Sequence, residues 1–322
     1  MSEIKETGLV RTAFISHPDY VLHDPGATHP ERPDRVRALL SHLEKADFLK
    51  NFLRIMPEPA DEKWIKLVHP SEYVRLVERA AVEAPSALDQ DTRLSSNSYY
   101  VAKLAVGGAL AAVDVVMEGG VKNAFAAVRP PGHHALAGRA MGFCLFNNVA
   151  IAARYLQEKF DLKRILIVDW DVHHGNGTQD IFYSDPSVLF FSTHQYPFYP
   201  GTGSAEETGA NVGEGFTVNI PIPSMAGNKE VVFAFREKLV PVADLFEPEF
   251  VLISAGFDGH QRDPLAQLQL TEEGFVELTR VVMEVAEKYA HGRVVSLLEG
   301  GYDLEGLMGS VEAHLMILAE LQ

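Results

Sequence analysis

RILIVDWDVHHGNG, residues 164–177, joins a run of apolar residues to a polar loop that is rich in glycine. The apolar part, residues 165–168, does not alternate with polar residues, which is typical of a strand buried on both faces of a parallel sheet. In open α/β sheets, ligands bind beyond the carboxyl ends of the strands. This stretch therefore predicts both a parallel sheet and a functional site at one edge of that sheet.

The rest of the chain repeats this alternation of strand and helix. Short apolar runs rich in β-branched residues predict strands at Thr12–Ser16, Ala124–Arg129, Arg164–Asp169, Val188–Thr193, Thr217–Ile222, Phe250–Ser254 and Arg293–Leu298. Amphipathic stretches between them predict helices at Pro33–Leu43, Glu72–Val82, Tyr99–Met117, Val149–Phe160, Lys229–Leu245 and Glu272–Tyr289. This alternation favours an α/β fold with one open, doubly wound, mostly parallel sheet and helices on both faces. No repeat or linker divides the chain, so residues 1–322 are expected to form a single domain, with segment 195–215 as a functional loop.

Composition narrows the class of protein. Of the 322 residues, 47% are hydrophobic and 22% are charged, the proportions of a globular chain with a sizeable core. No apolar run approaches the roughly 20 residues that span a bilayer, and the polar residues 1–8 do not resemble a signal peptide. The one cysteine, Cys144, is interpreted as a small buried hydrophobic residue. Because one cysteine allows no intrachain disulfide, we expect a reducing compartment and a cytoplasmic protein.

The net charge of −16 bears on the choice of partners. Direct binding of nucleic acid is disfavoured, since phosphate contacts need clustered Lys and Arg side chains and no such cluster stands out. In one interpretation the acidity serves solubility. In the other it attracts cationic substrates such as lysine-rich peptides or polyamines.

Polar clusters rich in glycine follow four of the predicted strands. They are RPPGHH (129–134), DWDVHHGNG (169–177), GFDGHQRDP (256–264) and EGGYD (299–303). Parallel strands present their carboxyl ends at one edge of a sheet. The four loops are therefore expected to converge on one active site.

Asp171 and His173 are spaced to bind one metal ion. In an extended segment, residues i and i+2 point to the same side, so the carboxylate and the imidazole reach the same point. Asp258, at the equivalent position after another strand, is the best candidate for a third ligand. One histidine and two carboxylates suit Zn²⁺ with a position left open for water and substrate, although Fe²⁺, Co²⁺ or Mn²⁺ would also fit.

His133 and His134 form a second histidine cluster, in a loop that prolines and a glycine stiffen. We interpret them as a general acid/base pair, because histidine titrates near neutral pH and both takes and returns a proton. Asp169 and Asn176 are available as their partners. An aspartate raises the pKa of its histidine more than a neutral asparagine does, so the two histidines are expected to differ in protonation.

Tyr302 follows two glycines, which permit unusual backbone angles and close approach. The tyrosine packs against its neighbours in one interpretation and donates a hydrogen bond to a developing oxyanion in the other. From these residues alone, packing is favoured.

Seven stretches together resemble the zinc-dependent histone deacetylase superfamily, which includes bacterial deacetylase-like amidohydrolases, acetylpolyamine amidohydrolases and acetoin-utilisation proteins. They are HPERPDR (29–35), RPPGHHA (129–135), GFCLFNNVAIAA (142–153), VDWDVHHGNGTQDIFY (168–183), FYPGTG (198–203), GFDGHQRDPL (256–265) and LEGGYDL (298–304). They stand in the family's order along most of the chain, and Asn176 and LEGGY resemble the class II branch. The resemblance implies an arginase-like α/β fold and a zinc-dependent amidohydrolase.

The resemblance also implies two kinds of metal ion. One catalytic Zn²⁺ would be held by Asp171, His173 and Asp258. A structural K⁺ would be bound, partly through backbone carbonyls, near Asp169, Asp171, His173, Ser192 and Thr193.

Catalytic roles follow from the same resemblance. His134 would be the general base and then the general acid to the leaving amine. His133, paired with Asp169, would be mainly an electrostatic helper. Tyr302 would donate to the substrate carbonyl oxygen, which reverses the preference for packing.

A tunnel for the acylated side chain is implied as well. Its wall would be formed by Gly142, Phe143, Leu265 and Tyr199, the last at a position where the family usually has phenylalanine. Asp91 would lie at the rim and hold the substrate backbone. Arg35 matches the family's arginine near an internal channel below the metal.

The expected reaction is hydrolysis of the amide of an N-acetylated amine, above all acetyl-lysine in peptides or proteins, with release of acetate and free amine. An acetylpolyamine deacetylase is the alternative, although a glutamate at the position of Leu265 would have favoured polyamines. A dimanganese ureohydrolase would need more bridging carboxylates, and a non-catalytic binding module would not need the full catalytic set. Assembly into a homo-oligomer stays open as a further source of specificity.

Overall fold

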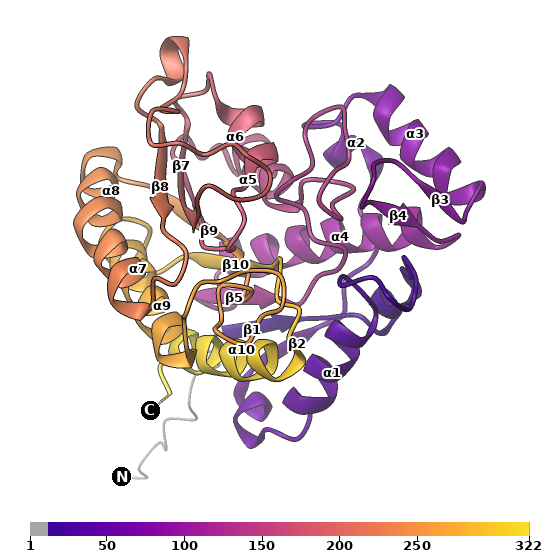
Figure 1. The fold of residues 1–322 in the computed structure, drawn as a ribbon. Helices are drawn as coiled ribbons and strands as arrows, with labels where there is room; N and C mark the ends of the chain where they lie inside the picture. Colours follow the sequence, from indigo (N-terminus) through magenta and orange to yellow (C-terminus); the bar gives the residue numbers. More distant parts are fainter. Residues whose placement is uncertain (1–11, 322) are drawn as a thin grey trace, which may run out of the picture.

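The computed structural model describes residues 12–321, which form one large sheet between layers of helices (Figure 1). The strands of this sheet, all paired in parallel, are β1 (Thr12–Ile15), β2 (Leu53–Ile55), β5 (Asn123–Ala126), β6 (Ile165–Asp169), β7 (Val188–Gln195), β8 (Thr217–Ile222), β9 (Phe250–Ala255) and β10 (Val294–Leu298). Their order across the sheet is β2-β1-β5-β10-β9-β6-β7-β8. This architecture confirms the fold class that the sequence predicts. The prediction for residues 1–8 lies outside the described residues.

Helices connect the strands and cover both faces of the sheet. In residues 12–321 the α-helices are α1 (Asp34–Leu43), α2 (Glu62–Ile65), α3 (Ser71–Val82), α4 (Ser98–Met117), α5 (Asn148–Phe160), α6 (Asn176–Phe182), α7 (Asn228–Ala234), α8 (Val240–Phe246), α9 (Glu272–Tyr289) and α10 (Leu304–Leu318). A small antiparallel pair is formed by β3 (Ser86–Ala87) and β4 (Arg93–Leu94).

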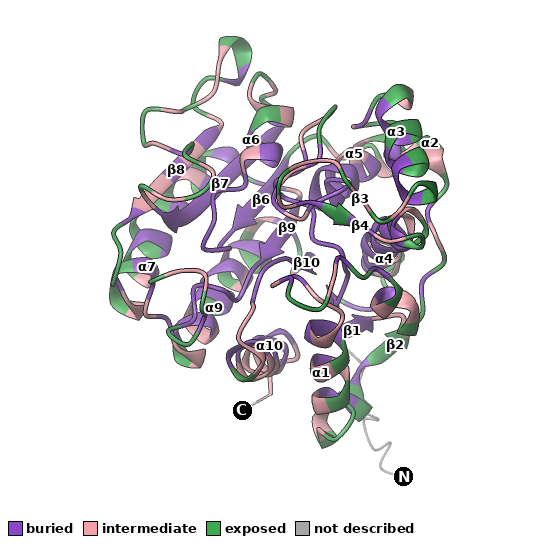
Figure 2. Ribbon diagram, turned by 45° about the vertical axis from the view of Figure 1, so that its right-hand side comes forward, coloured by how far each residue is buried: buried purple, intermediate pink, exposed green. Residues whose placement is uncertain are grey.

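Alternate strand residues enter two hydrophobic cores, one on each face of the sheet. In β6, Ile165 and Ile167 belong to the core that contains α3, α4 and α5. Leu166 and Val168 belong to the core that contains α7, α9 and α10. Figure 2 shows the central strands buried between these helices. Because successive side chains point to opposite faces and both faces are covered, a central strand such as β6 carries apolar residues at consecutive positions.

The helix predicted over Lys229–Leu245 is interrupted by a short π-helix. Its first part is α7 and its last part is α8, and the segment Phe235–Leu239 between them has π-helical hydrogen bonding. Pro241 stands at the start of α8. A proline has no N–H to donate within a helix and its ring crowds the preceding turn, so the wider turn before it lets the helix continue.

Helix α4 corrects one expectation about composition. It is 20 residues long and, by length and composition alone, apolar enough to cross a membrane, which the search for unbroken apolar runs overlooked. In the structure 67% of its most apolar window is buried, and α4 packs against β1, β5 and α5. Core helices pass the same test, so its apolar character is explained by this packing.

Candidate active site

Four loops with chemically active side chains meet at the carboxyl ends of neighbouring strands. Strands β5, β10, β9 and β6 are adjacent, and they are followed by residues 129–134, 299–303, 256–264 and 169–177. Because all four strands are parallel, their carboxyl ends lie at one edge of the sheet. The structure therefore brings together the four clusters that the sequence analysis expects to converge.

Asp171, His173 and Asp258 form a buried group of side chains that could hold a metal ion. One ligand atom from each lies within 4.8 Å of the others. His173 Nδ1 lies 3.1 Å from Asp171 Oδ1 and 3.1 Å from Asp258 Oδ2. Burial opposes a positive charge on His173, but its contacts with the two carboxylates outweigh burial and raise its pKa to about 10. The group therefore attracts positive charge, as a cation site must.

Backbone groups of neighbouring loops hold the two carboxylates. The Gly300 N–H donates to Asp171 Oδ2 at 2.8 Å. The Val172 N–H donates to Asp258 Oδ1 at 2.9 Å. A Cβ atom at Gly256 would lie 2.0 Å from Asp171 Oδ2, and a Cβ atom at Gly300 would lie 2.1 Å from Asp258 Oδ2. Glycine at these two positions lets the backbone pass close to the carboxylates, and at Gly300 the backbone N–H binds one of them.

His133 and His134 lie side by side, with ring centroids 4.0 Å apart, and have different partners. His133 Nδ1 lies 3.0 Å from Asp169 Oδ2. His134 Nδ1 lies 2.7 Å from Asn176 Oδ1. Burial lowers the pKa of His133, but the charges of Asp169 and Asp171 outweigh burial and hold this pKa well above its usual value. Burial and the charge of His133 hold the pKa of His134 well below its usual value. The pair therefore offers one charged and one neutral imidazole near neutral pH.

Glu299, to which the sequence analysis assigned no role, holds the backbone of the histidine loop. Its Oε2 accepts the N–H of Gly132 at 2.6 Å and the N–H of His133 at 3.2 Å. The carboxyl group is buried, and burial raises its pKa to about 7. Nothing in the sequence around Glu299 indicates this contact, because its partners lie in a loop far away in the chain.

Tyr302 lies on the wall of the same site. The Arg35 guanidinium carbon lies 4.9 Å from the centroid of its ring, and Phe143 meets the ring edge to face at 5.9 Å. The pKa of Tyr302 lies well above its usual value, chiefly because its hydroxyl is shielded from water within the site. Its hydroxyl therefore keeps its proton and is available as a hydrogen-bond donor.

The side chain of Arg35 binds the backbone of the turn that leads to Tyr302. Its Nε donates to the carbonyl oxygen of Gly301 at 2.6 Å, and its Nη2 donates to that of Glu299 at 2.6 Å. Its Nη1 donates to Glu31 Oε1 at 3.0 Å. The arginine is buried, so these contacts fix the turn that precedes Tyr302.

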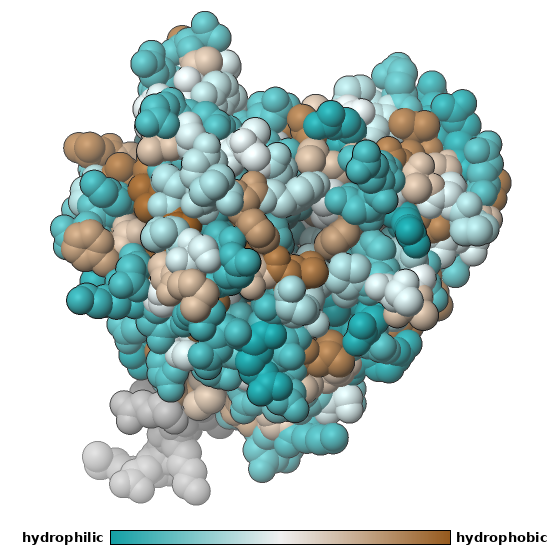
Figure 3. Space-filling model, in the orientation of Figure 1, coloured by the Kyte–Doolittle hydropathy of each residue, from teal (hydrophilic) through white to brown (hydrophobic). Residues whose placement is uncertain are grey.

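A pocket of about 210 Å³ leads to these residues. It is lined by Asp91, His134, Gly142, Phe143, His173, Phe198, Tyr199, Leu265 and Tyr302. The five residues that the resemblance assigns to the substrate all lie on its wall. On the face seen in Figure 3, hydrophobic residues gather around a hollow near the middle.

Phe198 is a wall residue that the sequence analysis missed. Its ring stacks on the ring of His173, with centroids 5.5 Å apart and planes 20° apart. Tyr199 meets the ring of His134 edge to face at 5.2 Å. The stretch FYPGTG contains both aromatic residues, but the resemblance placed only Tyr199 on the wall. In the structure Phe198 and Tyr199 both line the pocket.

Asp91 is held at the pocket from two sides. Its Oδ1 accepts the N–H of Gly142 at 3.2 Å. Its backbone carbonyl oxygen lies 2.9 Å from His29 Nε2. His29 begins the HPERPDR stretch, so this motif supports the loop that carries Asp91.

The residues considered for potassium lie on adjacent strands and in the loop that follows. Ser192 of β7 pairs with Asp169 of β6, and Thr193 comes next in β7. Both β7 residues are buried. The Ser192 hydroxyl lies 2.9 Å from His194 Nδ1, so it also has a protein partner. Binding of K⁺ by this group stays a prediction.

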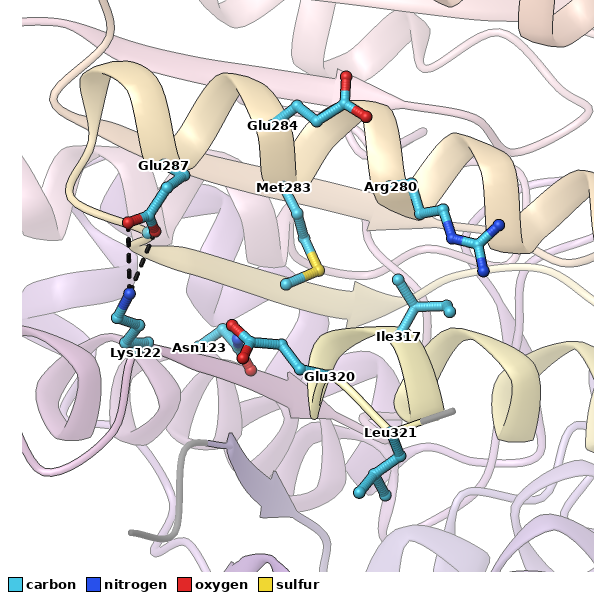
Figure 4. A pocket seen from close by; sticks show the side chains of 10 residues that line it. Lys122, Asn123, Arg280, Met283, Glu284, Glu287, Ile317, Glu320 and Leu321 are labelled. Atoms are coloured by element: carbon cyan, nitrogen blue, oxygen red, sulfur yellow. Dashed lines mark hydrogen bonds and ion pairs between the residues drawn. The ribbon is translucent and has the colours of Figure 1, made fainter.

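A larger cavity, of about 440 Å³, lies near the amino-terminal ends of the strands, away from the candidate site (Figure 4). Asn123, the first residue of β5, lines it together with residues of α9 and α10. An ion pair between Lys122 and Glu287, 3.2 Å long, lies on one side. None of the candidate site residues lines this cavity. Its greater size therefore does not mark it as the place of the chemistry.

Comparisons with known proteins agree with this geometry. The family described as histone deacetylase domain matches residues 29–318. A probable deacetylase of Archaeoglobus fulgidus is 42% identical over 299 residues, which cover 92% of this chain and 83% of that protein. Polyamine deacetylase HDAC10 of Homo sapiens is 43% identical over 316 residues, which cover 93% of this chain but 47% of the human protein, so the chain spans about half the length of that relative. The solved structure of the HDA15 HD domain matches with a TM-score of 0.92 at 40% identity, covering 98% of this chain and 89% of that one. The chain therefore belongs to the histone deacetylase family.

Proposed function

We propose that this protein is a zinc-dependent deacetylase that hydrolyses the amide bond of N-acetylated amines, chiefly acetyl-lysine in peptides and proteins. One observation carries the proposal: a single pocket is lined by His173 of the metal-binding group, by His134 of the histidine pair and by Tyr302. A metal ligand, a proton carrier and a hydrogen-bond donor around one cavity are the groups that hydrolysis of an amide requires. Relatives named as deacetylases support the same reaction.

Asp171, His173 and Asp258 would hold the zinc ion. One imidazole and two carboxylates are common zinc ligands, and three protein ligands leave a coordination position open. The raised pKa of His173 supports this assignment, because it reflects the negative charge of two buried carboxylates beside the imidazole. When bound, the ion supplies Lewis acidity to a carbonyl group and lowers the pKa of a water molecule.

His134 is placed to move the proton. Because its Nδ1 faces the oxygen of Asn176, this nitrogen carries the hydrogen and Nε2 is free to accept another. As water adds to the carbonyl carbon, His134 takes a proton from it. When the C–N bond breaks, His134 returns the proton to the departing amine, leaving acetate and free amine. The neighbouring His133, kept charged by Asp169, stabilises the negative charge that develops.

Tyr302 would donate its hydroxyl hydrogen to the carbonyl oxygen as that oxygen becomes negative. Its place on the pocket wall and its retained proton support this role. Removing one such donor in other enzymes costs about 100-fold or more in kcat. A structural K⁺ near Asp169 and Ser192 would add a fixed positive charge behind the site, where buried carboxylates are concentrated.

Acetylated polyamines are the second candidate substrate, because a relative of 43% identity is named a polyamine deacetylase. A second ammonium group on such a substrate would need a carboxylate at the rim. Leu265 occupies the wall without charge, which favours acetyl-lysine, whereas Asp91 supplies one carboxylate to the pocket. Asp91 and Leu265 are therefore the wall residues that distinguish the two candidate substrates.

The first experiment compares kcat/KM of the zinc-loaded protein for acetyl-lysine peptides, N-acetylputrescine and N-acetylspermidine. Preference for the peptides is expected, and preference for polyamines would move the assignment to the second candidate. Tyr302→Phe should lower kcat by about 100-fold on an amide substrate. Full activity of that variant, or full activity of protein shown to be free of metal, would contradict the proposed mechanism.

A further inference from the structure

Tyr302 follows a turn whose backbone adopts an unusual conformation. Gly301, the preceding residue, has a φ angle of +126°, which side-chain-bearing residues rarely adopt. A turn of this kind does not by itself fix the direction of the next side chain. The contacts of the Tyr302 backbone therefore bear on where its hydroxyl lies.

A buried carboxylate from another loop binds this backbone. Asp263 Oδ2 accepts the N–H of Tyr302 at 2.7 Å and the N–H of Asp303 at 3.3 Å. Its other oxygen, Oδ1, accepts the N–H of Leu265 at 2.9 Å. Asp263 is 7% exposed, so these hydrogen bonds are shielded from water and strong for their kind.

The two residues joined by Asp263 lie on the wall of the same pocket. Leu265 and Tyr302 both line it, whereas Asp263 does not. We propose that Asp263 is a positioning residue, which fixes the Tyr302 hydroxyl at the place of the developing oxyanion and sets Leu265 on the wall at the same time. This inference rests on the proposed role of Tyr302 in deacetylation.

A second link between the same loops provides a control. Arg262 Nε lies 3.0 Å from Asp303 Oδ1, and Arg262 also pairs with Glu305 at 2.5 Å. The arginine is 51% exposed, and exposed ion pairs contribute little because water screens them. If Asp263 fixes the turn, Arg262→Ala should leave kcat within about twofold of the wild-type value.

Asp263→Asn should lower kcat about 10- to 100-fold, because an amide NH₂ group replaces one acceptor oxygen and displaces a backbone N–H. Displacements near 1 Å carry costs of this size. KM for a short acetyl-lysine substrate should change less than about threefold, since the zinc ligands and the opposite wall are untouched. A general structural role would lower thermal stability and kcat together with no relation to Tyr302.

The test is a double-mutant cycle in which kcat is measured at saturating substrate. In the Tyr302→Phe background, Asp263→Asn should lower kcat less than about threefold, because the hydroxyl to be positioned is already gone. Equal losses in both backgrounds would overturn the proposal. If Tyr302→Phe alone keeps full activity, the proposed function of Tyr302 fails instead, and the two failures are thus told apart.

Asp263→Ser is the second variant, because it keeps one acceptor oxygen in a smaller side chain. The same cycle applies if the asparagine variant does not fold. Loss of the fold in both variants, shown by circular dichroism, would also overturn the proposal, since the residue would then be needed for folding rather than for positioning.

Discussion

Replacement of Gly300 by alanine tests whether close packing around two carboxylates sets the affinity for metal. A Cβ atom at this position would lie 2.1 Å from Asp258 Oδ2 and 2.6 Å from Asp171 Oδ2. Ordinary van der Waals contact begins at 3.4 Å, so the carboxylates or the loop must move by about 1 Å. The Gly300 N–H, which binds Asp171 Oδ2 at 2.8 Å, would move with the loop.

A shift of this size is large for a metal site. Distances from ligand to metal hold within about 0.2 Å of their ideal values. Even changes in groups that only support the ligands cost about 10- to 100-fold in affinity. We therefore expect the Kd for Zn²⁺ to rise about 100-fold or more, which corresponds to about 2.7 kcal/mol.

The assay is competition for Zn²⁺ between the metal-free protein and a chromogenic chelator. Gly138→Ala is the matched control, because a Cβ atom at that position would meet nothing within 4 Å. The control should bind Zn²⁺ as the wild type does, and circular dichroism should show that both variants are folded. Wild-type affinity in the Gly300→Ala variant would refute the assignment of the two carboxylates as packed metal ligands.

Three further changes test other parts of the site and of the core. Asp169→Asn removes the carboxylate that keeps His133 charged, so kcat should fall on the order of 10-fold. Because His133 then loses its proton more easily, the alkaline limb of the pH–rate profile should move to lower pH. An unchanged profile would contradict the electrostatic role of His133. Burial lowers the pKa of His314 to about 3, against 6.5 for a free histidine, so the unfolded chain binds more protons between these pH values and stability is lost as pH falls. At pH 4.5 this residue alone should cost about 3 kcal/mol of unfolding free energy. Urea titrations should show a flatter pH dependence for His314→Asn but not for His291→Gln, which changes an exposed residue. Leu265→Glu adds a carboxylate to the pocket wall and should raise kcat/KM for N-acetylspermidine about tenfold relative to that for an acetyl-lysine peptide. If the ratio of the two kcat/KM values is unchanged, residues other than Leu265 select the substrate.

The location of the site could be predicted because it depends on strand direction. Apolar runs such as residues 165–168 reveal buried strands, and parallel strands put the polar loops that follow them at one edge. The spacing of Asp171 and His173 then needs no knowledge of distant contacts, because two residues in an extended segment share a side. Asp258 was reached by the same rule, applied to a second strand.

Contacts that depend on tertiary packing could not be read from local pattern. Strand β2 has three residues at the edge of the sheet, too few to show alternation, and α10 is apolar along most of its length, which hides its helical period. Glu299 acts through the backbone of a loop more than 160 residues away in the chain. Phe198 and Tyr199 are neighbours, and only the fold shows that both rings reach the pocket.

The substrate is decided at the rim of the pocket, whereas the reaction is decided at its base. The family is named for histones and one relative is named for polyamines, so overall similarity does not choose between them. The groups at the base, His134 and the proposed zinc ligands, would act on the amide bond, which both substrates share. What differs is the rest of the substrate, which would meet wall residues such as Asp91, Tyr199 and Leu265. The Gly142 N–H already donates to Asp91 Oδ1, and the other oxygen of this carboxylate could accept from an amide N–H or from a second ammonium group, so the apolar Leu265 is the wall residue that favours acetyl-lysine.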